Sequence, residues 1–387
     1  MPSKAPLVLH TRVVRGTGGG PEKTILNSPR FLAPHGYDAL CAYMHPPRDP
    51  GFEELRRRAE QWDAPLVGIE DRGPWDLRVP GRLLGLCRSR RVAIWHGHDY
   101  KSNALGLLLR RFWPMKLVST VHGWGVIEGR TPLYYKIDRL CLRRYQSVIC
   151  VSDDLLRTCL RAGVPADRCV VVANAIDCDQ YARKLPTEEA KRRLGFDPGR
   201  LLVGSVGRLS DEKNFDGLIR AVDRLLGDGH EVDLILVGDG PRRDALHALA
   251  RDLGRRDRVH LLGYRSDTIE LYQAMDAFVL ASLREGLPNV VLEAMAMGVP
   301  VVATRVAGLP GLIQHDADGL LIDPGDADQL AAALGRLLED PGLRKRLAAA
   351  GHRTVEQKHS FAARMEKIRK IYDGLLGREE MTNDLLA

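Results

Sequence analysis

Long apolar runs are missing from this sequence of 387 residues. No stretch approaches the roughly 18 apolar residues that a helix needs to cross a bilayer. The first residues, 1–5, lack the layout of a signal peptide, so we expect a cytoplasmic protein. Hydrophobic residues make up 44% of the chain and charged residues 28%, which excludes disordered and fibrous proteins. The length suits two domains of ordinary size.

Cysteines are few and scattered. The seven of them are odd in number and include no CxxC pair, which predicts reduced structural thiols and not a disulfide framework or a zinc site. Aromatic residues amount to only 6%, and the sequence lacks an aromatic and basic signature of RNA binding. We therefore expect no nucleic-acid partner.

Acidic residues are scarce in the first half only. Residues 1–185 hold 29 Lys and Arg against 18 Asp and Glu, a balance of +11, whereas the remainder holds 28 against 32, a balance of −4. This asymmetry indicates an anionic partner for the first half. Arginine clusters at 56–58, 88–91, 110–111 and 139–144 lie partly beside aromatic residues, which leads to the hypothesis of peripheral attachment to the inner face of the plasma membrane. The alternative is that these arginines pair internally or complement helix C-termini.

Short β-branched runs alternate with helical patterns, which predicts parallel sheets covered by helices on both faces. The strands expected in the first half are Pro6–Arg12, Tyr37–Tyr43, Pro65–Ile69, Val92–His96, Lys116–Val121, Ser147–Val151 and Cys169–Val172. Those expected in the second half are Leu201–Val206, Val232–Val237, Val259–Leu262, Ala277–Ala281, Pro300–Ala303 and Leu320–Ile322. The fold class is therefore α/β, with two Rossmann-like, doubly wound domains.

A polar stretch separates the two sets of strands and sets the expected boundary. We predict an N-terminal domain over 1–182 and a C-terminal domain over 183–360. The last segment, about 361–387, begins with a charged helix, Phe361–Leu376, that is a candidate to pack back on the first domain.

Two loops of the second domain carry the candidate chemistry, because ligands of open parallel sheets bind where strands lead into helices. The first loop, 207–214, places Arg208 and Lys213 beside a helix N-terminus, which favours an anion such as a phosphate. The alternative is that both are solvated charges paired with Asp211 and Glu212. The second loop, 282–289, carries Glu285, with Glu293 one turn into the next helix. Both carboxylates could border the space before that helix and accept hydrogen bonds from sugar hydroxyls, or Glu293 could complement the helix dipole and Glu285 be a surface residue.

Together with three further motifs, these loops resemble family 4 retaining glycosyltransferases, which adopt the GT-B fold. The further motifs are Val237-Gly238-Asp239-Gly240-Pro241, Leu262-Gly263-Tyr264 and Gly298-Val299-Pro300-Val301-Val302-Ala303. The resemblance implies that Arg208 and Lys213 hold the donor diphosphate, Glu285 the sugar hydroxyls and Glu293 the ribose. It implies that the segment at Tyr264 and Arg265 meets the base. Further donor-binding residues on this basis are Gly238, Gly286, Leu287, Pro288, Asn289 and Val290.

The first domain resembles the family more loosely. Its loop Gly16-Thr17-Gly18-Gly19-Gly20-Pro21-Glu22 is similar to the family's glycine-rich loop, in which Gly19 and Gly20 would let the backbone approach the donor phosphate. The alternative is a flexible loop with a proline at the helix start. His122 stands where the family places a histidine that faces the donor sugar. Gly18, His98 and Trp124 are acceptor-side candidates.

The resemblance implies transfer of a sugar with retention of configuration, in a cleft between the domains. The donor would be a UDP- or GDP-sugar, and the acceptor a saccharide, a lipid-linked saccharide or another small hydroxyl compound, in cell-envelope or polysaccharide biosynthesis. Glu285, His122, Arg208 and Lys213 are the catalytic candidates. His96, His98 and Asp99 could suggest a metal cluster, but enzymes of this fold need no metal, and we expect no cofactor. The alternatives are a nucleotide-sugar epimerase, a pyridoxal-phosphate phosphorylase of similar architecture, and a non-catalytic sugar-nucleotide binding protein.

Overall fold

The computed structural model describes residues 5–74, 76–123, 131–285, 288–306 and 308–378. The chain forms two compact units, Met1–Asn174 with Phe361–Ala387, and Ala175–Ser360. The division falls between Asn174 and Ala175, before the predicted boundary at 182, because the chain leaves the first sheet at its last strand, which ends at Val171.

The first unit is built on a parallel sheet with the strand order β3-β2-β1-β4-β5-β6-β7 in the described residues. Its strands are β1 (Leu7–Val13), β2 (Asp38–His45), β3 (Leu66–Glu70), β4 (Val92–Gly97), β5 (Lys116–Val121), β6 (Ser147–Cys150) and β7 (Cys169–Val171). Its helices are α1 (Gly20–Leu32), α2 (Pro50–Gln61), α3 (Arg78–Arg90), α4 (Tyr100–Leu109), α5 (Thr131–Leu142), α6 (Asp153–Arg161) and α15 (Phe361–Leu376), with short 3-10 helices at Ala33–His35 and Ala166–Arg168.

The second unit has a parallel sheet with the order β10-β9-β8-β11-β12-β13 over its described part. Its strands are β8 (Leu201–Val206), β9 (Val232–Val237), β10 (Val259–Gly263), β11 (Ala277–Leu280), β12 (Val301–Thr304) and β13 (Leu320–Ile322). Its helices are α7 (Thr187–Leu194), α8 (Phe215–Gly227), α9 (Arg243–Asp252), α10 (Thr268–Ala274), α11 (Asn289–Ala296), α12 (Leu309–Leu312), α13 (Ala327–Glu339) and α14 (Pro341–Lys358), with the 3-10 helix η3 at Asp211–Lys213.

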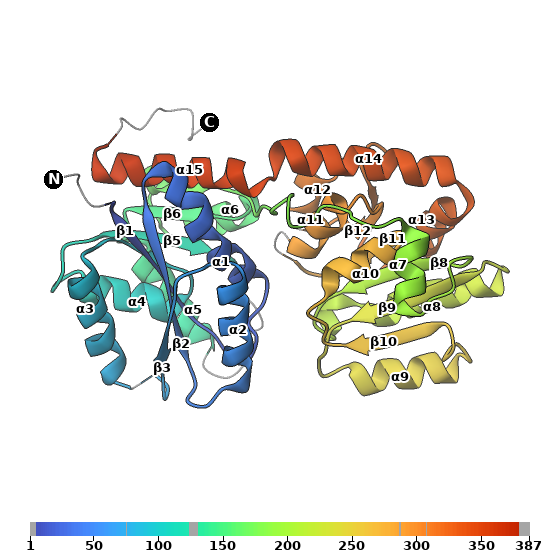
Figure 1. Ribbon diagram of the computed structural model, residues 1–387, viewed down its shortest axis with the longest axis horizontal. Helices are drawn as coiled ribbons and strands as arrows, with labels where there is room; N and C mark the ends of the chain where they lie inside the picture. Colours follow the sequence, from blue (N-terminus) through green and yellow to red (C-terminus); the bar gives the residue numbers. More distant parts are fainter. Residues whose placement is uncertain (1–4, 75, 124–130, 286–287, 307, 379–387) are drawn as a thin grey trace. The chain divides into compact units, whose positions relative to one another are not determined.

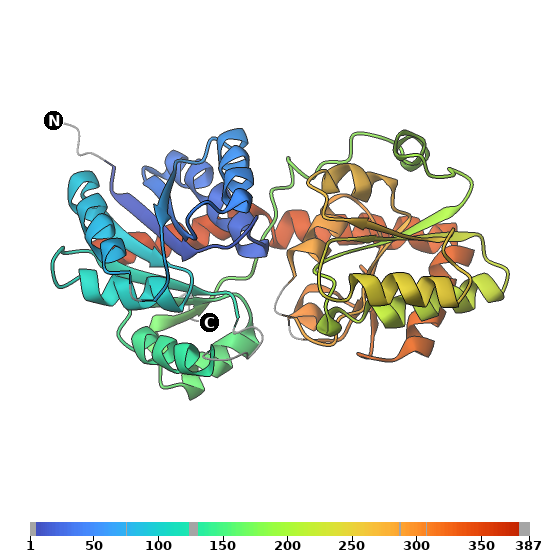
Figure 2. The same cartoon turned by 90° about the horizontal axis from the view of Figure 1, so that it is seen from below.

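Every strand predicted from the sequence is present, with ends shifted by no more than two residues. The two doubly wound sheets confirm the predicted fold class, and helices lie on both faces of each (Figures 1 and 2). Continuous apolar strands such as β11, buried along its whole length, form the core of the second unit with apolar faces of α8 and α13. Each buried Leu, Ile or Val there contributes about 1.5–3 kcal/mol relative to an exposed one.

The C-terminal helix α15 belongs to the first unit, although it follows the whole of the second in sequence (Figure 1). Arg364 donates to the carbonyl of Val172 at 2.8 Å, and Tyr37 donates its hydroxyl to Asp373 at 2.6 Å. Burial of Arg364 lowers its pKa to about 10. The first contact ties the start of α15 to the chain just beyond β7, and the second ties its end to the residue before β2.

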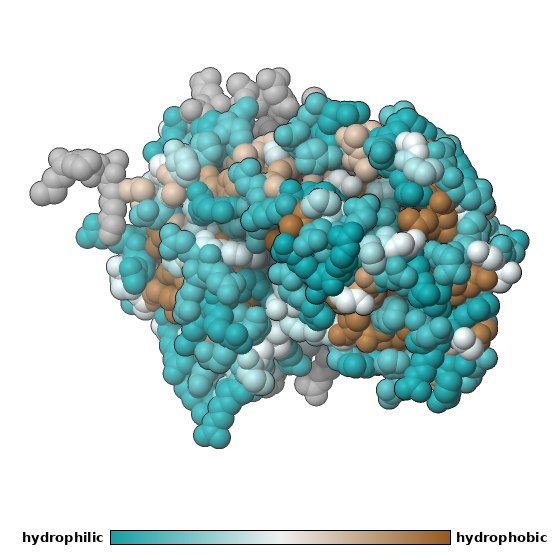
Figure 3. Space-filling model, turned by 45° about the vertical axis from the view of Figure 1, so that its right-hand side comes forward, coloured by the Kyte–Doolittle hydropathy of each residue, from teal (hydrophilic) through white to brown (hydrophobic). Residues whose placement is uncertain are grey.

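All seven cysteines are free thiols, as predicted. None of the described helices is both long and apolar enough to cross a membrane. The face seen in Figure 3 is mostly hydrophilic, with small apolar patches between the charged side chains.

Candidate active site

In each sheet, the strand order reverses direction at one place. In the first unit this switch lies between β1 and β4, and in the second unit between β8 and β11, which pair directly. Loops that leave two such strands diverge to opposite faces and open a crevice at their carboxyl ends. The two loops singled out in the second domain are those that follow β8 and β11, so the topology brings them together.

Several contacts join these two loops. The amide of Leu283 donates to the carbonyl of Glu212 at 2.8 Å, and the side-chain amide of Asn214 donates to the carbonyl of Ala281 at 3.3 Å. Lys213 forms an ion pair with Glu285. Two predicted site residues thus contact each other directly.

Glu285 is held by a second polar group. The hydroxyl of Ser282 donates to Glu285 Oε1 at 2.7 Å, and Thr304 donates to the carbonyl of Ser282 at 2.6 Å. Ser282 is fully buried, whereas the side chain of Glu285 keeps 11% of its surface exposed. A buried serine therefore aims a carboxylate that still reaches solvent.

Arg208 has no side-chain partner among the described residues and is exposed. Neither Arg208 nor Lys213 forms an ion pair with Asp211 or Glu212 in the described residues. Against the effect of burial, a hydrogen bond with Ser210 and then the charges of Lys213 and Arg208 lower the pKa of Glu212. Asp211 lies 3.3 Å from the guanidinium of Arg242, and Lys213 forms its ion pair with Glu285. Arg208 thus offers an exposed cation without an ion-pair partner in the described residues, beside η3 and the start of α8, where an anion is favoured.

The loops that follow β8, β9 and β10 are joined through backbone. Gly207 donates to Val237, and Gly238 donates to the carbonyl of Gly263 at 2.8 Å. Gly238 has a φ of +139°, and a Cβ there would lie 1.9 Å from the carbonyl oxygen of Gly207. Only glycine permits this approach. Beyond it, Tyr264 is 49% exposed and Arg265 forms an ion pair with Asp267.

Helix α11 begins at Asn289, with Pro288 before it and Val290 in its first turn. Glu293 lies one turn in, but its side chain does not border open space as expected: it is fully buried and accepts the hydroxyl of Tyr272 at 3.0 Å. Burial, and after it the neighbouring Glu293, raises the pKa of Tyr272 well above its usual value, so the phenol keeps its proton and stays a hydrogen-bond donor. Gly286 and Leu287 lie outside the described residues.

In the first unit, the glycine-rich loop between β1 and α1 is fixed by acidic side chains. Asp49 accepts the amide of Gly16 at 2.8 Å, and Glu22 accepts the amide of Gly19 at 2.5 Å. Glu22 is buried and also pairs with Arg12 at 2.6 Å. Gly18 has a φ of +70°, and a Cβ there would overlap Glu22. The amide of Gly19 is therefore already used within the loop, while Gly20 begins α1.

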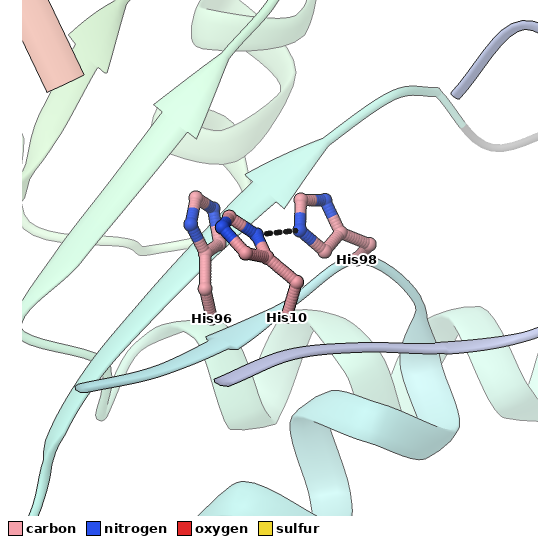
Figure 4. Close-up of side chains that lie close together, drawn as sticks. All are labelled: His10, His96 and His98. Atoms are coloured by element: carbon pink, nitrogen blue, oxygen red, sulfur yellow. Dashed lines mark hydrogen bonds between the residues drawn. The ribbon is translucent and has the colours of Figure 1, made fainter. Parts of the chain in front are cut away.

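Four histidines gather on neighbouring strands of the first sheet: His10 in the middle of β1, His96 near the end of β4, and His98 and His122 just after β4 and β5. His10 Nδ1 lies 3.0 Å from His98 Nε2, and His98 Nδ1 lies 3.1 Å from His122 Nε2. His96 stacks on His98 with ring centroids 4.4 Å apart. Figure 4 shows the side chains of His10, His96 and His98, with the bond between His10 and His98 dashed. Burial lowers the pKa of all four, that of His10 to about 3, so they are neutral at physiological pH. Trp124 lies outside the described residues.

The nitrogens of His10, His96 and His98 lie within 4.8 Å of one another, close enough to hold a metal ion. However, His96 Nδ1 lies 2.6 Å from the hydroxyl of Tyr372, and its Nε2 lies 2.8 Å from that of Thr120. A neutral imidazole hydrogen-bonded at both nitrogens has no lone pair left for a metal. The two remaining histidines fall short of the three or four protein ligands of a zinc site.

Several residues of these sites were not predicted. Ser282, Thr304 and Tyr272 orient the two glutamates, and His10 and Tyr372 complete the histidine cluster. His10 left a signal in the sequence, since it interrupts an apolar strand. The others left none, because their partners lie far away along the chain.

The fold and the two crevice loops define a GT-B glycosyltransferase. Residues 186–354 match the family model of glycosyl transferases group 1, and residues 18–180 match that of glycosyltransferase family 4. The uncharacterized glycosyltransferase MJ1607 of Methanocaldococcus jannaschii is 31% identical over 314 residues, which cover 77% of this chain and 80% of that protein. The lipopolysaccharide core biosynthesis glycosyltransferase LpsD of Rhizobium meliloti is 35% identical over 229 residues, 59% of this chain and 64% of that protein.

The fold of the Anabaena protein Alr3699/HepE, crystallised in complex with UDP-glucose, is similar with a TM-score of 0.82 and 23% identity, and covers 96% of this chain and 100% of that one. This chain belongs to the family 4, group 1 glycosyltransferases and is a transferase enzyme.

Proposed function

We propose that this enzyme transfers a sugar, with retention of configuration, from a UDP- or GDP-sugar to a saccharide, a lipid-linked saccharide or another small hydroxyl acceptor. The observation that carries the proposal is the joined pair of loops after β8 and β11, where exposed Arg208 stands beside the Lys213–Glu285 pair. Cations suit a diphosphate, and a carboxylate suits sugar hydroxyls. The complex of HepE with UDP-glucose supports a donor of this class.

The proposed reaction proceeds on one face of the donor sugar. The bond from the anomeric carbon to the diphosphate oxygen breaks, the bond to the acceptor oxygen forms, and the acceptor proton passes to the leaving diphosphate. Arg208 and Lys213 would neutralise the negative charge that develops there, which is electrostatic stabilisation of the departing group. When Lys213 binds the donor phosphate, its ion pair with Glu285 breaks. The carboxylate of Glu285 can then accept hydrogen bonds from the sugar. Glu293, released from Tyr272, would hold the ribose.

We propose that the reaction needs no metal and no cofactor, because the two cations take the place that a metal would occupy at the diphosphate. The test is one NMR assay of donor and acceptor, with and without a chelator. We expect a product with the donor's anomeric configuration and an unchanged rate under chelation. Donor incubated without acceptor should give no epimer, which separates a transferase from an epimerase. Epimer formation, an inverted product or loss of activity under chelation would each contradict the corresponding part of the proposal.

We also propose that the first unit attaches to an anionic membrane surface, as an enzyme of envelope saccharide synthesis would. Leu133, Ile137 and Leu140 follow helical spacing along α5 and are 56%, 39% and 50% exposed. The exposed charges on the described part of this helix, Lys136 and Arg139, are basic. Leu108 and Phe112, near the end of α4, add exposed apolar surface. The name of LpsD supports an envelope acceptor.

A cavity of about 320 Å³ adjoins this surface and is lined by Leu107, Arg110, Arg111 and Arg144. These three arginines form no ion pair within the described residues, which fits lipid phosphates. Each basic residue near an anionic bilayer is worth about 1 kcal/mol. Changing the three to Gln should therefore weaken binding to anionic vesicles roughly a hundredfold. The matched control changes the exposed Arg251, Arg256 and Arg353 of the second unit. Wild-type protein that stays in the supernatant with anionic vesicles at low salt would contradict the proposal.

A further inference from the structure

His10, His98 and His122 form one hydrogen-bonded row. The two N···N distances are 3.0 and 3.1 Å, both pairs of ring centroids are 5.3 Å apart, and the planes differ by 27° and 28°. In both contacts an Nδ1 faces an Nε2: His10 Nδ1 faces His98 Nε2, and His98 Nδ1 faces His122 Nε2. Each contact is short enough that one nitrogen must donate a proton to the other.

The row has only two consistent proton arrangements. A neutral imidazole carries one N–H and one lone pair, so His98 must donate to one neighbour and accept from the other. Fixing either bond then fixes both. Protonated imidazole is disfavoured, because burial and the nearby Arg364 hold the pKa of His10 far below its usual range.

The end of the row selects between the two arrangements. His10 Nε2 is buried and has no hydrogen-bond partner in the part of the chain that the structure describes. In one arrangement this atom carries an unpaired N–H, and in the other an unpaired lone pair. Buried N–H groups without a partner are rarer in proteins than under-satisfied acceptors. The favoured arrangement therefore puts the proton of His10 on Nδ1, from which it is donated to His98.

We propose that His10 and His98 are positioning residues that fix His122 as its Nδ1–H tautomer, so that His122 presents a hydrogen-bond donor to the bound sugar. With the proton of His98 on Nδ1, His122 Nε2 accepts and its own proton stays on Nδ1. That atom has no partner among the described residues, but His122, unlike His10, is only half-buried, so its N–H is open to water or a ligand and is not a buried group left without a partner. In this state Nδ1 cannot take a proton from an acceptor hydroxyl, so His122 binds an oxygen and is not the base. The tautomer follows from this row alone, and only its role toward sugar rests on the proposed function.

The first test is the ¹⁵N NMR spectrum of the full chain with labelled histidine, in which His122 is assigned by its loss in His122→Gln. We expect a protonated Nδ1 and an unprotonated Nε2 for His122. The opposite pattern, or a mixture, would overturn the proposal. This readout needs no substrate, so it stands or fails independently of sugar transfer.

The second test changes the end of the row. His10→Leu removes the donor to His98, whereas His10→Asn keeps an amide N–H close to the place of Nδ1. We expect His10→Leu to give a mixture of His122 tautomers and to lower kcat/KM for sugar transfer about tenfold, the effect of roughly one hydrogen bond. His10→Asn should keep both close to wild type, as should His45→Leu, a histidine of the same sheet outside the row. A His10→Leu protein that folds and keeps the wild-type tautomer of His122 would overturn the proposal. If His10→Leu does not fold, the ¹⁵N spectrum of the wild-type protein is the deciding measurement.

Discussion

Lys213 and Glu285 form an ion pair across 72 positions of sequence, between the loops that follow β8 and β11. The two strands are neighbours only because the strand order reverses between them. The two side chains neutralise each other at the place proposed for the diphosphate and the sugar. A donor that binds both residues must break this ion pair, so that Lys213 then contacts the diphosphate and Glu285 contacts the sugar.

The first prediction concerns the diphosphate. Arg208→Ala should weaken binding of a nucleoside diphosphate by about 10- to 150-fold, because a charge-assisted contact contributes roughly 1.5–3 kcal/mol. Binding of the free nucleoside should change little. Lys213→Ala should have a smaller effect, since the lysine must first leave Glu285. Calorimetry with both ligands measures this, and Arg251→Ala is the control. Equal weakening of both ligands would argue against phosphate contacts.

The second prediction concerns the sugar. Glu285→Gln should lower turnover by about ten- to a hundredfold, because a charged acceptor for the sugar hydroxyls is lost. Affinity for the nucleoside diphosphate should stay the same or rise, since Lys213 is released. Steady-state kinetics and calorimetry separate the two effects, with the exposed Glu339→Gln as control. Near wild-type turnover would mean that another carboxylate has this role.

The third prediction concerns the buried pair of Tyr272 and Glu293. Tyr272→Phe should lower the free energy of unfolding by about 1–3 kcal/mol, because the buried carboxyl group loses a hydrogen bond. In a Glu293→Leu background the same change should cost much less, since the partner is absent. Urea unfolding of the four proteins of this cycle gives the coupling. Equal losses in both backgrounds would show that the hydroxyl has no such role.

The fourth prediction is a loss of stability in mild acid. The pKa of buried His10 is lowered to about 3, and those of His96 and His98 lie well below 6.5. The unfolded chain therefore binds more protons than the folded one between about pH 6.5 and pH 3, and stability falls as the pH falls through that window. His10 alone should cost about 1.4 kcal/mol at pH 5.5. His96, His98 and His122, whose pKa values are also lowered by burial, should add to this loss.

Urea unfolding at pH 7.5 and 5.5, at constant ionic strength, measures this loss. His247→Gln changes an exposed histidine outside the cluster and should leave the difference between the two pH values unchanged. A stability independent of pH over this range would show that the buried histidines take up protons in the folded chain.

The sequence by itself determined the strands and their grouping into two sheets, because burial on both faces demands continuous apolar runs such as Ala277–Leu280. It also determined which loops carry the cations and carboxylates, since a parallel strand presents its carboxyl end to the following loop. The need for glycine at position 238 is instead visible only in the structure, where a Cβ would lie 1.9 Å from the carbonyl oxygen of Gly207.

Only the tertiary structure decided how these groups pair. The partner of Lys213 is Glu285 and not the adjacent Glu212, and Glu293 turns inward to Tyr272. His10 meets His98 across 88 positions of sequence. Local patterns report which face of a strand or helix is buried, whereas a hydrogen-bond partner depends on which distant elements the topology makes neighbours. The register between β1 and β4, and the reversal between β8 and β11, exist only once the sheets have formed.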